Sequence, residues 1–189
     1  MIAGHDRALE LLERALTYTR TTLSSVGPDR SGPTPCAGWS LADLLAHMDD
    51  GLDTFLEAAG GTVRVEVPWR AGADLEGLQR KACHLMGVWS GPTPSLVVVG
   101  DQTLPIDLLV SAAALEIAVH GWDVAQATGL DHPLPEDLAR SLLPIARRMV
   151  ADEDRAERFA APVKPVPGTG RSGQLLGFLG RAPRLVVNS

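Results

Sequence analysis

Hydrophobic side chains recur along much of the chain at helical spacing, and this pattern predicts a mainly α-helical protein. Residues 6–25 place apolar positions three and four apart with charges between them, which is typical of an amphipathic helix. That helix is expected to end before Gly27 and Pro28, which are common helix-stop residues. The same reasoning predicts further helices from Ser40 to about Gly60, over 74–89, over 105–128, and over 135–152 with Pro144 inside it.

Three stretches depart from the helical pattern. Residues 62–69 (TVRVEVPW) are predicted to be extended, and residues 96–104 (LVVVGDQTL) are predicted to form a β-hairpin. A Pro/Gly-rich tail follows the last long helix and favours an extended course over the surface, with a short helix at 172–179. We therefore predict an irregular four-helix bundle over residues 1–158 and a C-terminal tail with a packed short helix over 159–189.

Composition narrows the class of protein. The 189 residues are 45% hydrophobic and 21% charged, which is enough apolar material for a buried core. The net charge of -6 argues against a nucleic-acid-binding surface. Two cysteines are too few for a disulfide scaffold, and we expect neither an N-terminal signal block nor an apolar run of about 18–20 residues. These features predict a cytoplasmic protein with small-molecule partners, and with neither nucleic acid nor membrane as a partner.

The nearly apolar segment 106–128 carries the most informative polar residues. Glu116 and His120 are four residues apart and therefore share one face of the predicted helix. A buried carboxylate must find a partner. Two explanations fit the spacing: the two residues pair with each other or with an arginine, or both face a metal ion, for which carboxylate and imidazole are normal ligands.

A third ligand is needed for the metal interpretation, and His47 is the best candidate among five histidines. It lies in the apolar stripe of the helix that begins at Ser40, where a lone histidine is more often a core residue. With Glu116 and His120 it completes a two-histidine, one-carboxylate set. Three protein ligands leave a position open for water or substrate, whereas a fourth, such as His84 or an aspartate, would close a structural site. The same set also binds non-haem iron.

Several neighbours of these residues have two interpretations. Asp43 precedes His47 by four residues and either orients its imidazole or caps the helix at Ser40. Asp123 follows His120 by three residues and either holds that ligand or pairs with an arginine. The sequence around Cys36 offers no activating neighbour, so we interpret this cysteine as structural. Trp39 and Trp122 are interpreted as packing residues, and no catalytic residue is identified.

Two motifs carry a resemblance to a known family. Residues 34–51 (TPCAGWSLADLLAHMDDG) resemble the Thr-Pro-Cys-x-Gly-Trp-x3-Asp-Leu-x2-His motif of the DinB/YfiT-like metal-binding superfamily. About 70 residues later, residues 116–129 (EIAVHGWDVAQATG) are similar to the second motif of its actinobacterial group related to the mycothiol-dependent maleylpyruvate isomerase. The tail, with FAAPVKPVP and QLLGFLGRAPR, also resembles the ending of that group.

This resemblance implies a DinB-like four-helix bundle that holds a divalent metal through His47, Glu116 and His120. It implies zinc, with nickel or iron as alternatives, and a metal-dependent mycothiol S-transferase or isomerase that acts on a small electrophile. A homodimer is expected by analogy alone. The full isomerase has a further C-terminal domain that contributes to its active site, and this chain is too short to hold one.

Other functions remain open on the sequence. They are a non-catalytic metal-containing protein that binds a small ligand, a metal-dependent hydrolase, and a site that has lost its metal. The residues after His47 are more acidic than the motif leads us to expect. Asp49 and Asp50 lie either on the solvated surface or at the mouth of the site, where they would repel anionic substrates.

Overall fold

The structure is a computed structural model that describes residues 2–63, 74–152, 155, 160–165 and 168–182. Within these residues the chain is mainly helical, as predicted. It contains the helices α1 (Ile2–Leu23), α2 (Leu41–Ala58), α3 (Leu75–Trp89), α4 (Ile106–Thr128), α5 (Glu136–Met149) and α6 (Gly170–Phe178). The strands are β1 (Thr62–Val63), β2 (Leu96–Val99) and β3 (Gln102–Pro105).

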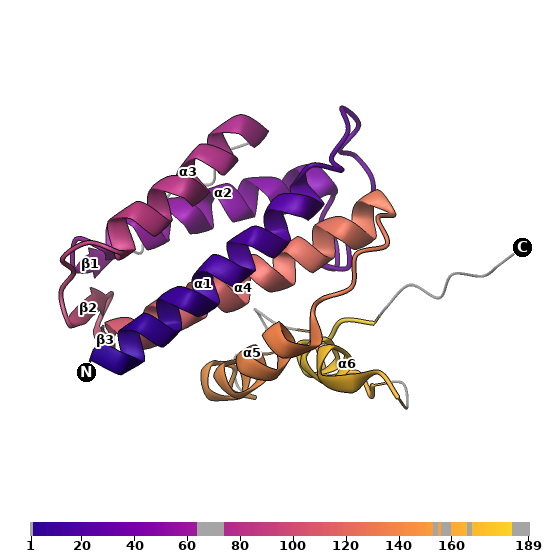
Figure 1. The fold of residues 1–189 in the computed structure, drawn as a ribbon. Helices are drawn as coiled ribbons and strands as arrows, with labels where there is room; N and C mark the ends of the chain where they lie inside the picture. The colour runs from indigo at the N-terminus through magenta and orange to yellow at the C-terminus, as the bar shows by residue number, and fades with distance from the viewer. Residues whose placement is uncertain (1, 64–73, 153–154, 156–159, 166–167, 183–189) are drawn as a thin grey trace, which may run out of the picture.

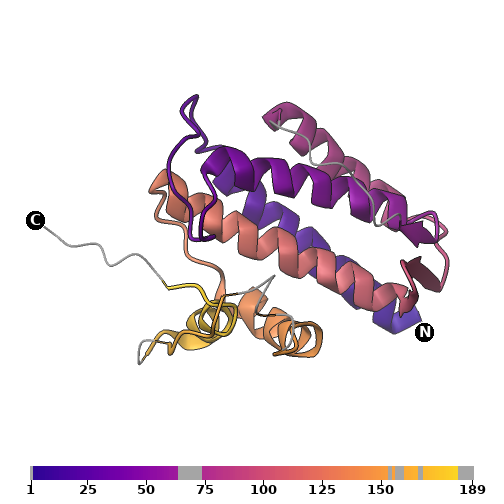
Figure 2. The same ribbon diagram turned by 180° about the vertical axis from the view of Figure 1, so that it is seen from behind.

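The first four helices form the bundle. α1 and α4 make the most extensive helix pair, and they lie side by side along their length (Figure 1). α2 packs along α4 on the far side, and α3 packs on both α2 and α1, which closes the ring (Figure 2). α5 contacts α4 and α1 from outside this ring, and α6 packs mainly on α5. The region enclosed by α1 to α4 is where the candidate ligands converge.

The helices that carry these ligands are well specified locally. Ser40 caps α2 through a capping box with Asp43, and the buried stripe of α2 includes Leu44, Leu45 and Met48. α4 is buried on almost every side, as its all-round apolar sequence requires, and it ends where Gly129 adopts a left-handed conformation.

α4 also corrects one expectation from the sequence. It is long and apolar enough to cross a membrane by length and composition, although no such run was expected. In the structure, 83% of its most apolar window is buried inside the protein. This is the burial of a core helix of a globular bundle, packed against the other helices.

The small sheet joins the bundle at one end. β2 and β3 form the predicted hairpin, with Leu96 opposite Pro105, and β1 pairs with β2 in parallel. Of the extended segment predicted at 62–69, the part from 64 onward lies outside the described residues. Several helix ends differ from prediction by a few residues: α1 begins at Ile2, α5 ends at Met149 and α6 spans Gly170–Phe178. The sequence marks a helix end less sharply than the helix itself.

Candidate metal centre

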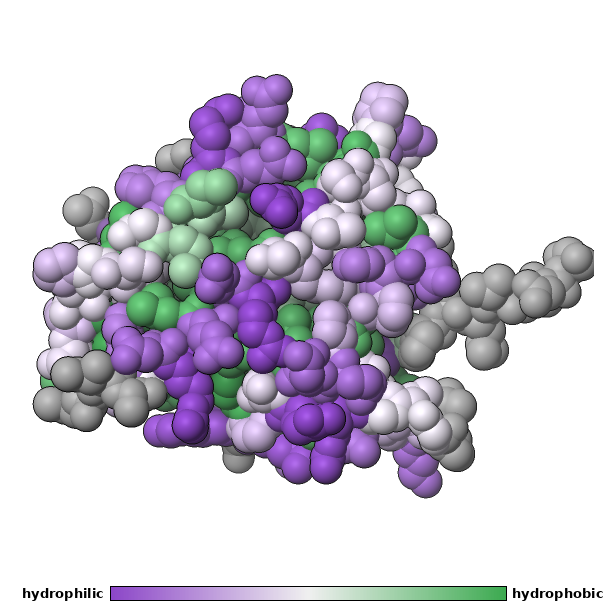
Figure 3. Space-filling view, in the orientation of Figure 1, coloured by the Kyte–Doolittle hydropathy of each residue, from purple (hydrophilic) through white to green (hydrophobic). Residues whose placement is uncertain are grey.

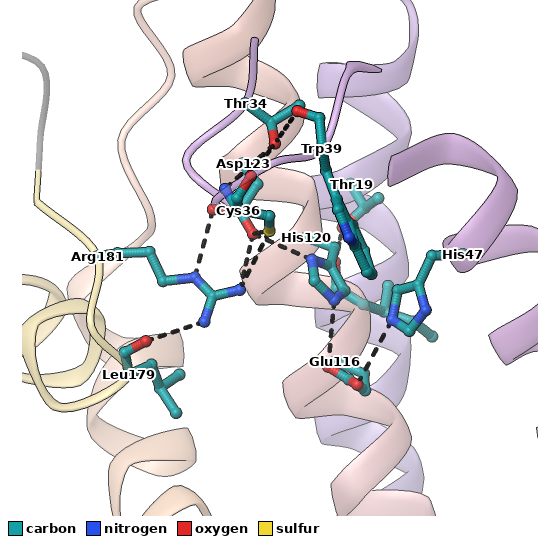
Figure 4. A network of polar contacts seen from close by, with 11 residues as sticks. Thr19, Thr34, Cys36, Trp39, His47, Glu116, His120, Asp123, Leu179 and Arg181 are labelled. Atoms are coloured by element: carbon teal, nitrogen blue, oxygen red, sulfur yellow. Dashed lines mark hydrogen bonds and ion pairs between the residues drawn. The ribbon is translucent and has the colours of Figure 1, made fainter. Parts of the chain in front are cut away.

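His47, Glu116 and His120 converge between α2 and α4. One donor atom from each of the three side chains lies within 4.8 Å of the other two. Nε2 of His47 is 3.9 Å from Oε1 of Glu116, and Nε2 of His120 is 3.5 Å from Oε2 of Glu116. Figure 4 shows the two imidazoles approaching the carboxylate from different helices. The structure therefore brings together the trio that the sequence singled out.

These separations fit a shared cation better than direct hydrogen bonds. Both distances exceed the range of about 2.7–3.2 Å in which a nitrogen donates well to an oxygen. Two ligands placed about 2.1 Å from one tetrahedral ion lie about 3.4 Å apart. The donor set of two imidazoles and one carboxylate is also a usual one for zinc. The residues present thus fit a divalent metal ion, and within the described residues this group contains no fourth protein donor.

A cavity of about 740 Å³ opens beside the three donors. Side chains of α1, α2, α3 and α4 surround it, and His47, Glu116 and His120 are part of its wall. The side chain of Glu116 is 47% exposed and that of His47 is 36% exposed, whereas that of His120 is only 8% exposed. A molecule that enters the cavity therefore meets the donors from their accessible side.

Behind His120 lies a buried polar network. Nδ1 of His120 is 3.0 Å from Oδ2 of Asp123, whose side chain is fully buried. Arg181, which follows α6, donates to the same oxygen from Nη2 at 3.0 Å (Figure 4). The thiol of Cys36 donates to it at 3.3 Å. A carboxylate on the second ring nitrogen fixes the imidazole orientation, as is usual for histidine ligands of metals.

The charges around the two imidazoles push their protonation in opposite directions. Burial lowers the pKa of His47, and the neighbouring His120 and Arg181 lower it further against the opposing effect of Glu116. Burial acts the same way on His120, but Glu116 and the hydrogen bonds to Asp123 and Cys36 override it and raise its pKa to about 10. The two carboxylates thus favour a positive charge at His120.

Asp123 responds to the same contacts. Burial alone would raise its pKa, but the hydrogen bond from His120 and the charge of Arg181 lower the pKa of this carboxyl below its usual 3.8. The sequence left open whether Asp123 holds His120 or pairs with an arginine. The structure shows that it does both, through one carboxylate.

A close approach of α1 and α4 fixes the helix that carries two of the donors. A Cβ on Gly121 would lie 3.0 Å from Cβ of Thr19 and 3.2 Å from its Cα, so a side chain at 121 has no room. The hydroxyl of Thr19 donates to the carbonyl of Ile117 at 2.7 Å. The helix pair is thereby held at one spacing beside His120.

Other predicted neighbours take different places. The carboxylate of Asp43 accepts bonds from the backbone N–H and the hydroxyl of Ser40, which is the capping alternative. The ring of Trp39 lies 4.8 Å from that of His47 and 6.5 Å from that of His120, between centroids, which supports its packing role. Trp122 is buried in the core, as expected of a packing residue, and His84 is exposed on α3.

Arg181 was not identified from the sequence, and the contact of the Cys36 thiol with Asp123 was not predicted. Arg181 is 58 residues from Asp123 in the chain, and Cys36 is 87 residues from it. The one sequence signal that could have found Arg181 is the resemblance of the FLGRAPR ending to that of the family. Asp49 binds Lys81 of α3 at 2.8 Å, together with Asp53 at 2.7 Å. Neither Asp49 nor Asp50 lines the described cavity.

Comparison with known proteins identifies what the chain is similar to. Residues 9–125 match the family described as mycothiol maleylpyruvate isomerase N-terminal domain. Two uncharacterized proteins of Mycobacterium tuberculosis, one from strain CDC 1551 / Oshkosh and one from strain ATCC 25618 / H37Rv, are each 28% identical over 179 residues. Each alignment covers 91% of this chain and 96% of the relative.

Two solved structures resemble the fold. The crystal structure of the mycothiol-dependent maleylpyruvate isomerase matches with a TM-score of 0.54 at 19% identity. A histidine-to-alanine mutant of that isomerase matches with a TM-score of 0.52 at 18% identity. Both matches cover 74% of this chain and 68% of the solved chain. At this identity the match establishes a shared fold.

Proposed function

The chain belongs to the mycothiol maleylpyruvate isomerase N-terminal domain family, and from this we propose that it is a divalent-metal-dependent enzyme that uses a thiol. The thiol is a low-molecular-weight one, with mycothiol as the first candidate because the family carries its name. The second substrate is a small electrophile, so that the protein acts as a thiol S-transferase or isomerase. Zinc is the metal that the donor set favours, with nickel or iron as alternatives.

One observation carries this proposal. Nε2 of His47, Nε2 of His120 and the carboxylate of Glu116 meet within 4.8 Å on the wall of an accessible cavity. Three protein donors beside an open space are the arrangement of catalytic metal sites, whereas structural sites are closed by four.

Different residues at this site would bind the metal, orient its ligands and enclose the substrate. His47, Glu116 and His120 would hold the ion, which when bound lowers the pKa of a thiol and so supplies nucleophilic sulfur at neutral pH. Asp123 keeps Nε2 of His120 directed at the site by holding Nδ1. A substrate that fills the cavity, whose wall is mostly apolar, would cover the reacting groups and displace water from them.

The proposed reaction is addition of the thiol to an activated double bond. The S–H proton leaves, a sulfur–carbon bond forms, the carbon–carbon π bond breaks, and the neighbouring carbon takes up a proton. If the adduct is released, the result is an S-transfer. If the adduct rotates about the new single bond and then loses the same thiol, the result is cis–trans isomerisation, and the thiol is regenerated.

Metal analysis of the purified protein tests the site. We expect about one divalent ion per chain, and we expect His47→Ala and His120→Ala each to lose it. His84→Ala is the matched control, because His84 is exposed on α3 outside the cluster, and this variant should keep the metal. Retention of full metal content by both His47→Ala and His120→Ala would refute the assignment.

A thermal-shift titration with mycothiol tests the thiol. The proposal expects a rise in Tm that disappears after chelation of the metal, because the thiol binds through the ion. Titration with the corresponding methyl thioether is the control and should give a smaller rise. Full metal occupancy without any response to the thiol would instead favour a metal-containing protein that binds a different small ligand without catalysis.

The second candidate is a metal-containing protein that binds a small ligand without catalysis. The size of the cavity beside the three donors favours it, because 740 Å³ is within the range of ligand-binding sites. The two candidates differ in turnover. Incubation with mycothiol and an activated alkene such as dimethyl maleate should give the thioether adduct or the trans isomer faster than the uncatalysed reaction only if the protein is an S-transferase or isomerase.

A further inference from the structure

We propose that the cavity beside the metal centre binds an uncharged, predominantly apolar molecule, and that Gly51 provides the room for it. This inference rests on the proposed function and deepens it, because it names the class of the electrophilic substrate. Its evidence is the chemistry of the cavity wall and the position of one glycine.

The wall of the cavity offers little to a multiply charged ligand. Apart from the candidate metal ligands, its charged residues are Glu13 and Arg20, which lie two turns apart on α1, are exposed and have opposite signs. A dianionic substrate would require several cationic groups, and one arginine with one glutamate two turns away on the same helix supplies no net positive charge. The rest of the wall is mostly apolar and includes Leu16, Leu23, Leu52, Phe55, Met86 and Ile117.

Apolar side chains also reach the surface near this cavity. In the space-filling view they gather over α3, beside the hydrophilic side chains of α1 (Figure 3). Ala82, Cys83 and Met86 of α3 line the cavity, and none of the three is fully buried. An apolar molecule would cover these groups and remove them from water, which is favourable by about 25 cal/mol for each Å².

Gly51 leaves open space in the cavity wall one helical turn from His47. It lies four residues after His47 on α2, so the two share one face of the helix, and Phe55 continues that face one turn later. All three line the cavity. A Cβ built on Gly51 meets no atom within 4 Å, so the missing side chain leaves open space one helical turn from the imidazole.

A glycine at this position has no backbone requirement. Gly51 lies inside α2 with an ordinary negative φ, where glycine costs about 1 kcal/mol of stability relative to alanine. Packing does not require it either, because no neighbouring atom would be displaced. The remaining role that the structure gives it is to keep the cavity open next to His47.

Two fluorescent dyes of nearly equal shape test the charge preference. N-phenyl-naphthylamine is uncharged, and anilinonaphthalene sulfonate carries one negative charge on a closely similar framework. We expect the neutral dye to bind the purified protein with a Kd at least about tenfold lower than that of the sulfonate. Equal or tighter binding of the sulfonate would overturn the proposal.

Substitution of two glycines tests whether Gly51 keeps the cavity open. Gly51→Phe should fill the space beside His47 and raise the Kd of the neutral dye at least about tenfold. Gly87→Phe is the matched control, because Gly87 is also inside a helix with no atom within 4 Å of a Cβ, but does not line the cavity. It should change the Kd less than twofold. Equal effects of the two substitutions would overturn the role of Gly51.

Metal content and dye binding, measured on the same samples, distinguish a failure of this proposal from a failure of the proposed function. If Gly51→Phe does not fold, Ala82→Phe on the opposite wall serves in its place with the same expected loss of dye binding. Metal content is measured on every sample, and removal of the metal with a chelator should change the Kd of the neutral dye less than about threefold. Loss of dye binding in Gly51→Phe with full metal content supports the apolar cavity, and absence of metal from the unmodified protein refutes the metal centre instead.

Discussion

The two sides of His120 show two different kinds of polar environment. On the Nδ1 side, a fully buried carboxylate collects hydrogen bonds of 3.0–3.3 Å from an imidazole, a guanidinium and a thiol. On the Nε2 side, the partners are 3.5–3.9 Å apart, and the carboxylate is half exposed at a cavity. The first arrangement is complete in itself, because every donor has its acceptor. In the second arrangement, the Nε2 atoms of the two imidazoles and the carboxylate of Glu116 are too far apart for good hydrogen bonds, but at a distance that a bound cation would bridge.

This difference separates support from function. Residues on the support side, Cys36, Asp123 and Arg181, are expected to matter mainly for folding and for the orientation of His120. Residues on the cavity side, His47 and Glu116, are expected to matter mainly for metal binding. Three predictions test that division, and a fourth concerns a contact far from the site. They are given in order of their expected effect on stability.

The largest loss of stability is expected for Asp123→Ala. The change leaves the Arg181 side chain, which is only 11% exposed, without its carboxylate, and it leaves His120 without its hydrogen-bond partner. Removal of one partner from a buried ion pair typically costs about 3–5 kcal/mol. Urea denaturation followed by circular dichroism gives the free energy of unfolding. A loss below about 1 kcal/mol would mean that this network does not support the fold.

A smaller loss is expected for Arg181→Met, which keeps most of the side-chain volume but removes the guanidinium. Asp123 would lose two charge-assisted hydrogen bonds while it keeps those from His120 and Cys36, at a cost of about 1.5–3 kcal/mol. Metal affinity, measured by competition with a chelator, should fall about 10-fold because His120 is held less firmly.

The control for Arg181→Met is Arg171→Met. Arg171 is exposed on α6 and its guanidinium bonds only to Gln174 among the contacts of the described residues. This variant should keep both stability and metal affinity. If it weakened metal binding as much as Arg181→Met does, the effect would belong to α6 in general and not to the bond with Asp123.

Glu116→Gln should show the opposite profile. Its carboxylate is half exposed and makes no short hydrogen bond to either histidine, so we expect a stability change below about 1 kcal/mol. Metal affinity should fall more than about 100-fold, because an anionic ligand is replaced by a neutral amide. Unchanged metal affinity together with a large loss of stability would reverse the division between the two sides.

The smallest effect is expected far from the site, at Glu136. This exposed side chain accepts bonds from the backbone N–H groups of Arg171 and Ser172 and from the Ser172 hydroxyl, which hold α6 to the start of α5. The hydroxyl and backbone bonds lower the pKa of Glu136 below its usual 4.5. Its contribution is therefore fully present above about pH 4.5 and lost as the pH falls through the lower, folded-state pKa.

Glu136→Gln should accordingly reduce Tm slightly at pH 7, and the difference from the unmodified protein should shrink in acid. The exposed Glu10 on α1 offers a matched control, and Glu10→Gln should leave Tm at pH 7 unchanged. A Tm difference that grows as the pH falls would contradict the expected sign.

The helices of the bundle and the convergence of His47, Glu116 and His120 could be predicted from the sequence, because both follow from residue spacing within single helices. The four-residue spacing of Glu116 and His120 fixes a shared face, and the stripe that contains His47 fixes which side of α2 points inward. For Asp43 the sequence allowed two partners, and the local one prevailed because Ser40 is in reach within the same helical turn.

The support side was not predictable in the same way. Arg181 reaches Asp123 only because the chain after α6 returns to α4, and no periodicity in the sequence records such a return. The cavity likewise depends on how four helices pack. The one sign of it in the sequence is Gly51, because glycine is unfavoured inside a helix.

The close contact between Gly121 and Thr19 restricts which residues related proteins can carry at these two positions. A side chain at 121 would collide with the backbone of α1, and relief by helix separation would move the neighbouring imidazole. Relatives that keep the histidine are therefore expected to carry glycine at 121 or, where they carry alanine, to compensate with a smaller residue at 19. Positions 19 and 121 should covary even though neither contacts a ligand.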